Sequence, residues 1–520
     1  MSDENREMGT QEMGAAVMGT EDINSGHGGV FGDAKNTPSG QNKYPPSPLP
    51  LSAALEAQRQ DFLQEGAVGV STRIDRLDRG IDVLLKYQNQ LVDALNTDFS
   101  CRARQVTLLT DVAASITPLK HARKHLHKWM KPQRRPSSFP FNLLGGRSHI
   151  EYQPLGVVGV ISPWNFPVNL TFGPLAGILA AGNRVMIKPS EFTPATSEVM
   201  QQMVSEAWDP KEVTLFTGGP EVGQAFSALP FDHLLFTGAT SVARHIMAAA
   251  ARNLVPVTLE LGGKSPVILS RSANLEQSLE RVMLGKTLNA GQICLAPDYL
   301  LVPEEQLEEV IRVAQKVVSA MYPRMLDNPE YTAIVNARHY ERLSGYLQEA
   351  EQRGVRTVVI NPAGEDFIAH KESRKIPPTL IVNPADDMLV MEEELFGPLL
   401  PIRTYKNFDE TINYVNAHPR PLAAYYFGQD RQEEQAVLSR TTSGGVCIND
   451  VIMHIMQEDL PFGGVGPSGM GVYHGLDGFR TFSHAKSVYR QSRLNIGKLG
   501  GMLPPYGKAT EQTIKMQVKR

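Results

Sequence analysis

Two residues that could form and break a thioester lie in short glycine-containing segments of this chain. Cys294 ends the segment GQIC, and Glu260 begins the segment ELGGK. A cysteine thiolate can attack a carbonyl carbon, and a carboxylate can activate the water that releases the acyl group. A single cysteine is more often an inert, buried, small residue, and a glutamate is more often a surface charge. The pair therefore needs support from the rest of the chain.

A stiffly held asparagine is a candidate partner for such a thiol. Asn165 lies in the segment PWNFP, between two aromatic residues and two prolines that restrict the backbone. A side-chain amide held in this way can donate a hydrogen bond to the oxyanion that forms on an attacked carbonyl. The alternative is a structural asparagine in a turn, which is the commoner role of this residue.

Two other segments have the composition of a nucleotide-binding site. Lys188 and Glu191 belong to KPSE, and Gly238 and Thr240 belong to FTGAT. A lysine at the carboxyl end of a strand can reach a hydroxyl or a phosphate, and a glutamate can accept hydrogen bonds from ribose hydroxyls. A glycine before a helix lets the backbone approach a pyrophosphate. Both segments also fit ordinary turns. KPSE could be a surface turn that ends at its proline, and FTGAT lacks the GxGxxG pattern of a dinucleotide-binding motif.

The elements that must position these residues alternate between strand and helix. After a helical segment at 51–132, short β-rich runs are separated by stretches that are long enough for helices. The predicted strands are 155–161, 184–187, 213–216, 234–237, 257–261, 299–302, 355–360, 399–405 and 424–427. This order is typical of βαβ units on parallel sheets, and it predicts two α/β domains with a boundary between Glu260 and Pro266.

Two smaller features refine this organisation. The helical segment should bury one apolar face, which consists of Ile81, Leu84, Leu85, Leu91, Val92 and Leu95. The pair Gly145-Gly146, within residues 137–152, predicts a hairpin that interrupts the first domain. The late segment 480–489 could pair with this hairpin.

Composition excludes several classes of protein. The 520 residues are 42% hydrophobic and 20% charged with a net charge of −4, which indicates a globular chain without a nucleic-acid-binding surface. Cys101, Cys294 and Cys447 form neither a disulfide framework nor a metal-binding CxxC pattern. No apolar run suggests a membrane span, and residues 1–50 lack a signal-peptide core and predict a flexible tail. A reducing, cytoplasmic location is expected, with no metal and no membrane.

Seven segments together make the chain resemble the aldehyde dehydrogenase superfamily over roughly residues 55–495. They are PWNFP at 163–167, KPSE at 188–191, FTGAT at 236–240, ELGGK at 260–264, GQIC at 291–294, EELFGP at 393–398 and PFGGVGPSGMG at 461–471. Within the superfamily, the segments NLTFGPLAGILAAGN and GMGVYHGLDGFRTFSH resemble the class 3 branch. The chain is also similar to the bacterial coniferyl aldehyde dehydrogenases of that branch.

The resemblance implies the aldehyde dehydrogenase fold, an α/β fold with a Rossmann-like cofactor domain, an α/β catalytic domain and a small β oligomerisation arm. After the tail at 1–50, the implied parts are the NAD(P)-binding domain at 51–136 and 153–262, the catalytic domain at 263–460 and the arm at 137–152 and 480–497. The arm implies a homodimer.

The resemblance also implies a reaction. Cys294 attacks an aldehyde to give a thiohemiacetal, whose oxyanion is held by the Asn165 amide and the backbone N–H of Cys294. Hydride transfer to a nicotinamide leaves a thioester, and Glu260 activates the water that hydrolyses it to the acid. Ile293 stands where a small polar residue is common in the superfamily, and it is expected to narrow the substrate site.

The implied cofactor is NAD, with NADP also possible. The residues that would hold it are Lys188 and Glu191 at the adenine-side ribose, Gly238 and Thr240 by the pyrophosphate, and Glu394 and Phe396 by the nicotinamide ribose. Glu191 should favour NAD, because a 2′-phosphate would face its charge.

The substrate and two rival functions stay open at this point. An aromatic or cinnamyl aldehyde such as coniferyl aldehyde is favoured, and a long-chain aliphatic aldehyde is the alternative. A catalytically silent binding or scaffold protein on the same fold is disfavoured by the joint presence of Asn165, Glu260 and Cys294. A thiol esterase without cofactor is disfavoured by the residues expected to hold NAD(P).

Overall fold

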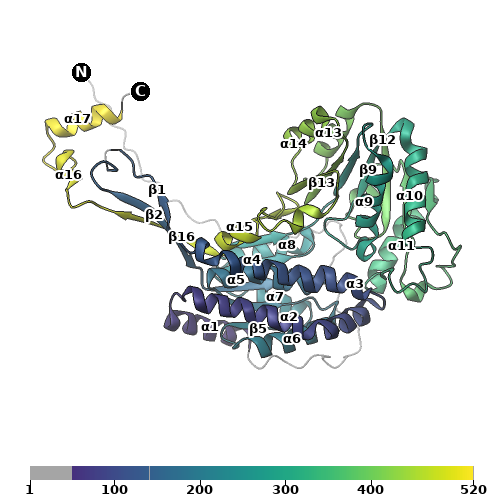
Figure 1. Ribbon diagram of the computed structural model, residues 1–520, viewed down its shortest axis with the longest axis horizontal. Coiled ribbons are helices and arrows are strands. Elements are labelled where there is room, and N and C mark those ends of the chain that lie inside the picture. The colour runs from purple at the N-terminus through teal and green to yellow at the C-terminus, as the bar shows by residue number, and fades with distance from the viewer. Residues whose placement is uncertain (1–49, 140, 519–520) are drawn as a thin grey trace, which may run out of the picture. The chain divides into compact units, whose positions relative to one another are not determined.

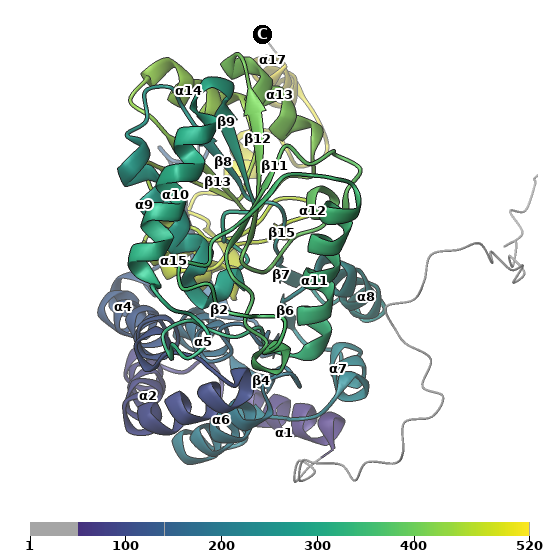
Figure 2. The ribbon, with the colours of Figure 1, turned by 90° about the vertical axis from the view of Figure 1, so that its right-hand side faces the viewer.

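The computed structural model describes residues 50–139 and 141–518. The tail predicted for residues 1–50 therefore lies outside the described residues, apart from Pro50. Within the described part of the chain, no helix is both long and apolar enough to span a membrane. Three β-sheets organise this part, and Figures 1 and 2 show them from two directions.

The first sheet has the doubly wound topology that the alternating pattern predicts. Its strand order is β15-β7-β6-β3-β4-β5, and all neighbouring strands are parallel except the short edge strand β15. The strands are β3 (Val157–Ile161), β4 (Arg184–Lys188), β5 (Val213–Leu215), β6 (His233–Thr237), β7 (Val257–Glu260) and β15 (Gly469–Met470). The strand order reverses at β3, and ligands bind at the carboxyl ends of strands beside such a reversal.

Helices cover both faces of the first sheet because its strands are apolar on both sides. Val158 and Val160 pack into a cluster with side chains of α2, α4, α5 and α6, whereas Val157 packs with side chains of α1, α7 and α8. The bounds are α1 (Leu51–Glu65), α2 (Val70–Phe99), α4 (Ala114–Trp129), α5 (Asn169–Ala181), α6 (Pro194–Ala207), α7 (Pro220–Ser227) and α8 (Thr240–Ala251). Figure 1 shows α2, α4 and α5 as one helical layer.

The second sheet contains seven strands in the order β10-β11-β12-β9-β8-β13-β14, parallel except for β10. They are β8 (Pro266–Leu269), β9 (Tyr299–Pro303), β10 (Thr357–Val359), β11 (Thr379–Val382), β12 (Leu399–Tyr405), β13 (Ala423–Phe427) and β14 (Gly445–Ile448). Leu300 and Val302 face α9 and α10, and Tyr299 and Leu301 face α13 and α14.

Six α-helices and four 3₁₀ turns belong to the part of the chain from β8 to η5. The α-helices are α9 (Leu275–Thr287), α10 (Leu307–Met321), α11 (Ala337–Gln352), α12 (Leu389–Glu392), α13 (Phe408–Ala417) and α14 (Arg431–Arg440). The 3₁₀ turns are η2 (Leu288–Gly291), η3 (Glu304–Gln306), η4 (Lys371–Ser373) and η5 (Met453–Met456).

The third sheet contains a hairpin and the late segment. The hairpin begins earlier than the predicted 137–152, because its first strand lies at 133–135, and the pair Gly145-Gly146 ends the connection before its second strand. Its order is β1-β2-β16, with β1 (Gln133–Arg135), β2 (Arg147–Pro154) and β16 (Ser483–Arg490) all antiparallel. The pairing of the late segment with the hairpin is confirmed, although the strand begins at Ser483 because Arg480 and Thr481 belong to α15 (Gly475–Thr481). The short helices α16 (Ile496–Leu499) and α17 (Lys508–Gln517) follow β16.

The helical segment at 51–132 differs from its prediction in two respects. Leu85 is 46% exposed, whereas the other five residues of the predicted face are buried. The face is narrower than predicted, because Leu85 lies about 100° around the helix from the buried Leu84. The second helical run is not uniform either: α3 (Arg104–Thr107) passes through the π-helical turn η1 (Leu108–Ala113) before α4 begins.

The neighbours Leu84 and Leu85 give a matched test of this packing. We expect Leu84→Ala to lower the free energy of unfolding by about 2–5 kcal/mol, because it leaves a cavity in a fully buried site. Leu85→Ala should change it by less than about 0.5 kcal/mol. Thermal unfolding of both variants checks this, and an equal loss in both would contradict the burial described here.

Candidate active site

The candidate segments gather at one edge of the first sheet. The PWNFP segment follows β3, KPSE begins with the last residue of β4, and FTGAT runs from the end of β6 to the first residue of α8. The segment ELGGK begins at the last residue of β7 and leads into β8 of the second sheet. Since the carboxyl ends of parallel strands share an edge, the fold brings these distant segments together beside the point where the strand order reverses.

The loop that carries Cys294 has an unusual backbone. We refer to residues 288–295 as the Cys294 loop. Three successive residues, Asn289, Ala290 and Gly291, have positive φ values of 51°, 52° and 73°. Such a run is costly for residues other than glycine, and strain of this kind concentrates at functional sites. A Cβ at Gly291 would collide with the carbonyl group of Gly397, so the Cys294 loop packs directly against the EELFGP segment.

Asn165 is bonded to the Cys294 loop. Its side-chain Nδ2 donates a hydrogen bond to the carbonyl oxygen of Gln292 at 3.1 Å, and Asn165 is only 3% exposed. Gln292 is fixed in turn, because its side chain donates to the carbonyl oxygens of Asn289 and Ala333 and accepts from the N–H of Val335. An amide nitrogen carries two hydrogens, so one remains for a ligand beside Cys294.

The thiol of Cys294 is held mainly in its neutral form. Burial raises its pKa above the usual range, and the carboxylates of Glu394 and Glu260 raise it further. The backbone N–H groups of Cys294 and Leu295 act in the opposite direction, because they hydrogen-bond to the thiolate. The side chain is partly exposed, so its sulfur can reach a small molecule. These interactions place Glu260 and Glu394 in the electrostatic environment of the thiol.

Glu260 is a buried carboxyl group whose oxygens lack hydrogen-bond partners among the described residues. It is 2% exposed and lies at the end of β7. Burial raises its pKa well above the usual value. A carboxyl group with a raised pKa and free oxygens is suited to take a proton from water, and such groups concentrate at functional sites.

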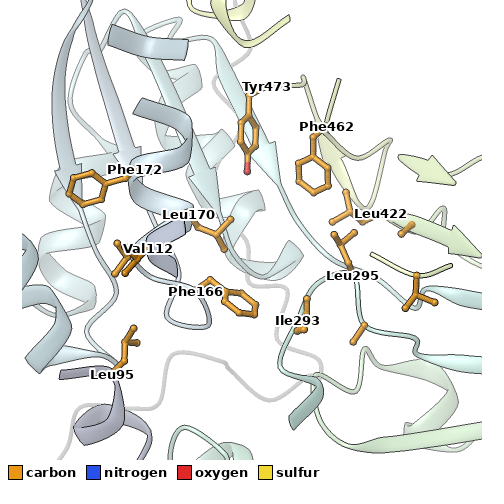
Figure 3. Close-up of a cluster of buried hydrophobic side chains, with 14 of the residues drawn as sticks. Leu95, Val112, Phe166, Leu170, Phe172, Ile293, Leu295, Leu422, Phe462 and Tyr473 are labelled. Atoms are coloured by element: carbon orange, nitrogen blue, oxygen red, sulfur yellow. The ribbon is translucent and has the colours of Figure 1, made fainter. Parts of the chain in front are cut away.

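Apolar and aromatic side chains surround this polar centre. Phe166 of the PWNFP segment and Ile293 of the Cys294 loop belong to one buried cluster with Phe462 and Tyr473. Figure 3 shows the side chains of Phe166 and Ile293 with those of Phe462 and Tyr473 above them. Tyr473 interacts electrostatically with Glu260 and Cys294. A group bound at Cys294 therefore meets a largely apolar environment.

Glu394 is anchored by its neighbours, but one of its oxygens stays free. The backbone N–H of Gly263 hydrogen-bonds to the carboxylate, and Arg342 donates to the carbonyl oxygens of Glu394 and Leu395 at 3.3 and 2.8 Å. Burial, followed by the charge of Asp298, raises the pKa of Glu394 to about 8. Its Oε1 has no hydrogen-bond partner among the described residues, so it can accept a bond from a ligand hydroxyl.

Phe396 has a positive φ of 48° and packs edge-on against Trp164, with ring centroids 5.3 Å apart. Trp164 also contacts His339 at 5.1 Å between ring centroids. This aromatic group joins the EELFGP segment to the PWNFP segment beside the Glu394 carboxylate.

A lysine fastens the three loops that meet here. Lys264 forms an ion pair with Asp298, and its Nζ also donates to the carbonyl oxygens of Val390 and Glu393 at 2.9 Å each. Asp298 accepts a hydrogen bond from the N–H of Leu395 at 3.0 Å. The ELGGK segment, the chain after Cys294 and the EELFGP segment are thus connected through one ammonium group.

Lys188 and Glu191 lie together at the carboxyl end of β4. Lys188 is 3% exposed, its Nζ donates to the carbonyl oxygen of Pro189 at 2.7 Å, and it lies 3.5 Å from a carboxylate oxygen of Glu191. Burial lowers the pKa of Lys188. An ammonium with one neutral acceptor and one long ion pair has donor capacity left, so the pair fits the hydroxyls of a ribose.

The turn after β6 fits a cofactor less directly. The backbone N–H of Gly238 donates to the carbonyl oxygen of Glu260 at 3.0 Å, and the hydroxyl of Thr240 donates to the carbonyl oxygen of Pro467 at 3.1 Å. The Gly238 N–H is therefore used by the sheet and is not free for a phosphate. A Cβ at Gly238 would press on the Phe236 ring, so the turn still requires a glycine. Because α8 begins at Thr240, its N-terminus can still favour a negatively charged group beside the turn.

Four further residues hold this centre together. Lys264 and Gln292 lie inside the recognised segments, which is a signal that could have identified them. Asp298 and Arg342 lie outside these segments and have no such signal in the sequence. Cys447 also lies outside these segments, and its Sγ lies 3.1 Å from His454 Nδ1. Burial raises the pKa of Cys447, so this contact does not by itself make a reactive thiolate.

Gly262 offers a test of the Glu394 position. A Cβ at Gly262 would collide with both carboxylate oxygens of Glu394 and lie 2.6 Å from its Cδ. We expect Gly262→Ala to displace the carboxylate and to weaken NAD(P) binding about tenfold or more, since a hydrogen bond to a charged group contributes about 1.5–3 kcal/mol. Gly345→Ala is the control, because nothing lies within 4 Å of its added Cβ. Fluorescence titration with NAD measures both, and equal affinity in the two variants would contradict the prediction.

Comparisons with known proteins agree with this geometry. The model of the aldehyde dehydrogenase family matches residues 50–488. The chain is 57% identical over 471 residues to a probable coniferyl aldehyde dehydrogenase of Caulobacter vibrioides, covering 90% of this chain and 97% of that protein. It is 54% identical over 470 residues to the coniferyl aldehyde dehydrogenase of Pseudomonas sp. strain HR199, covering 90% and 96%.

A solved structure of Staphylococcus aureus AldH in a substrate-bound state matches with a TM-score of 0.84 and 36% identity, over 91% of this chain and 100% of that chain. An NAD⁺ complex of the Bacillus cereus aldehyde dehydrogenase matches with a TM-score of 0.75 and 27% identity, over 85% and 88%. A family match of this length and relatives of this identity decide the membership. The chain belongs to the aldehyde dehydrogenase family, which oxidises aldehydes with NAD(P).

Proposed function

We propose that this enzyme oxidises bulky aromatic aldehydes of the cinnamyl type, such as coniferyl aldehyde, to carboxylic acids through a thioester on Cys294. The observation that carries the mechanism is the buried Glu260 carboxyl group, whose oxygens lack partners among the described residues and which interacts with the Cys294 thiol. The interaction of Tyr473 with Cys294 and the likeness to the 54% identical coniferyl aldehyde dehydrogenase of Pseudomonas support the substrate class.

Cys294 reacts through its thiolate, which is the minor form of this buried thiol. Its sulfur adds to the aldehyde carbon, and the carbonyl electron pair moves to oxygen to give an oxyanion. The free N–H of the Asn165 amide and the backbone N–H of Cys294 donate to this oxyanion. The bond between Asn165 and Gln292 holds the amide in place before substrate arrives, so little reorganisation is needed when the charge develops.

Glu260 acts in the second half of the reaction. When bound, NAD(P) supplies the acceptor for the hydride that leaves the thiohemiacetal carbon, and the carbonyl group reforms as a thioester. Glu260 in its ionised form takes a proton from water, whose oxygen attacks the thioester carbon. The Cys294 thiolate leaves as the acid forms.

The residues proposed to hold the cofactor fit it unequally. Lys188 and Glu191, which form an ion pair, would hold the adenine-side ribose, and the free Oε1 of Glu394, with Phe396, would hold the nicotinamide ribose. Glu191 disfavours the 2′-phosphate of NADP by charge, so NAD is the proposed preference. Gly238 and Thr240 contribute through the shape of the turn and the N-terminus of α8 rather than through the Gly238 N–H.

The proposed organisation has three parts, and it departs from the three sheets at β1, which lies within 51–136, and at β15, which lies after 460. We assign the cofactor domain to residues 51–136 and 153–262, the catalytic domain to 263–460 and the arm to 137–152 and 480–497. The eight-residue edge strand β16 supports the arm as the place where two copies form a homodimer. A cytoplasmic location is proposed from the free cysteines.

Two rival activities are distinguished by simple measurements. A silent scaffold protein would give no absorbance of reduced cofactor with NAD and any aldehyde. A thiol esterase would turn over without cofactor, and it would not need Lys188, Glu191 and Glu394 at the edge of the first sheet.

Glu260→Gln tests the mechanism. We expect the first turnover of hydride transfer to survive and thioester hydrolysis to slow by about 10²–10⁴-fold, the usual contribution of a general base. Because the pKa of Glu260 is raised, its ionised form and hence hydrolysis should increase as pH rises through that pKa, and the variant should lose this dependence. Stopped-flow measurement of the burst checks this, with Cys294→Ala as the inactive control. Unchanged steady-state turnover in Glu260→Gln would refute the role.

A substrate panel tests the specificity. We expect kcat/KM to be highest for a cinnamyl aldehyde, lower for benzaldehyde and lower again for a long aliphatic aldehyde, because planar rings pack well among aromatic side chains. Initial rates with saturating NAD provide the comparison. A preference for the aliphatic aldehyde would favour the alternative substrate class instead.

A further inference from the structure

A buried ion pair outside all seven segments contacts the backbone of the PWNFP segment. Arg102 follows α2, and Asp111 lies in the π-helical turn η1. Both side chains are fully buried, and Arg102 Nη2 lies 2.6 Å from Asp111 Oδ2. The pair is remote in sequence from the proposed catalytic residues, and the mechanism above does not use it.

The two side chains hold the PWNFP region from two sides. Arg102 Nη1 donates a hydrogen bond to the carbonyl oxygen of Asn165 at 2.8 Å. Asp111 Oδ1 accepts hydrogen bonds from the N–H groups of Val168 and Asn169 at 3.1 and 3.4 Å. The guanidinium also lies 5.1 Å from the centre of the Phe166 ring. The ion pair thus fixes the backbone of the residue that bears the proposed oxyanion donor and of the turn that follows it.

The π-helical turn provides the position of Asp111. The six-residue turn from Leu108 to Ala113 interrupts the helical run between α3 and α4. Such a turn inserts an extra residue into a helix and redirects the side chains beside it, and π-turns are frequent at functional sites. The side chain of Asp111 is directed to the residues that follow the PWNFP segment, while the neighbouring Val112 lies in the apolar core.

Stability alone is a weak reason for this arrangement. Removing two charges from water is costly, and apolar residues of similar size often stabilise a fold as well as a buried ion pair does. Arg102 Nε also has no partner among the described residues, which adds to the cost. Apolar replacements could not provide the three directional bonds, one to the Asn165 carbonyl oxygen and two from the N–H groups of Val168 and Asn169.

We propose that Arg102 and Asp111 are positioning residues for the oxyanion donor, which act on the reaction only by holding Asn165 beside Cys294. The proposal rests on the function proposed above for Asn165. Asn289 Nδ2 also donates to the Asn165 carbonyl oxygen, at 3.2 Å, so this oxygen joins the ion pair to the Cys294 loop. Rotation of the Asn165 backbone would move its side-chain amide away from the oxyanion.

A double-mutant cycle between Arg102 and Asn165 tests the proposal. Lysine keeps the charge of Arg102 but lacks the planar fork that bonds two acceptors at once, so we expect Arg102→Lys to slow the hydride-transfer burst about tenfold. In the Asn165→Ala background the same change should cost less than about twofold, because the donor it positions is absent. If Arg102→Lys fails to fold, Asp111→Asn replaces it, because it keeps the shape of the side chain and loses its charge. It should also slow the burst, and the slowing should be smaller in the Asn165→Ala background.

Two further measurements separate positioning from a general structural effect. Cofactor-free hydrolysis of p-nitrophenyl acetate by Cys294 also passes through an oxyanion, so it should fall by a similar factor in Arg102→Lys, while affinity for NAD should not change. Arg73→Lys is the matched control: Arg73 is 3% exposed and donates to the carbonyl oxygens of Val68, Ala180 and Ala181, outside the proposed site. It should lower the melting temperature without slowing the burst.

The outcomes divide clearly. A loss that depends on Asn165 and appears in both reactions supports the positioning role. Equal losses from Arg102→Lys in the two backgrounds, or no loss at all, overturn it while leaving the proposed function intact. An Asn165→Ala enzyme with an unchanged burst overturns both the oxyanion role of Asn165 and the positioning role. A Cys294→Ala enzyme that still oxidises aldehydes shows that the proposed function itself has failed.

Discussion

The hydrogen bond from the Asn165 amide to the Gln292 carbonyl is the contact on which the candidate site depends. It joins the loop after β3 of the first sheet to the loop before β9 of the second sheet. Each loop is strained or fixed on its own side, by three left-handed residues before Cys294 and by the Arg102–Asp111 pair beside Asn165. A thiol and an amide from different sheets can therefore keep one geometry, as catalysis by preorganised donors requires.

The same junction contains two carboxyl groups that are buried away from bulk water. Glu260 and Glu394 both have buried oxygens without partners among the described residues, and burial raises both pKa values. An unpaired buried carboxylate is unfavourable, so the fold holds these groups through rigid surroundings such as the Lys264–Asp298 pair and Gly262. This cost is understandable if the free oxygens are used by water at Glu260 and by a ribose hydroxyl at Glu394.

The sequence predicted the elements better than their connections. Alternating apolar runs located β3 to β7, β9, β12 and β13 to within two residues, because strands with helices on both faces are short and apolar. The same pattern did not mark β11, β14 or β15, and it placed Leu85 on a buried face. Segment resemblance indicated Cys294, Glu260 and Asn165, but Asp298, Arg342, Arg102 and Asp111 act through contacts between distant parts of the chain, which no local pattern encodes.

Gly238 shows how far a resemblance carries. Its place before α8 suggested a backbone N–H for a pyrophosphate, yet that N–H completes the register of β6 with β7 by bonding to the carbonyl oxygen of Glu260. The glycine is still required, because a Cβ would strike the Phe236 ring. Gly238 therefore helps to position Glu260 and also sets the shape of the turn after β6. At this edge of the sheet, one backbone hydrogen bond thus joins the turn before α8 to the strand that bears Glu260.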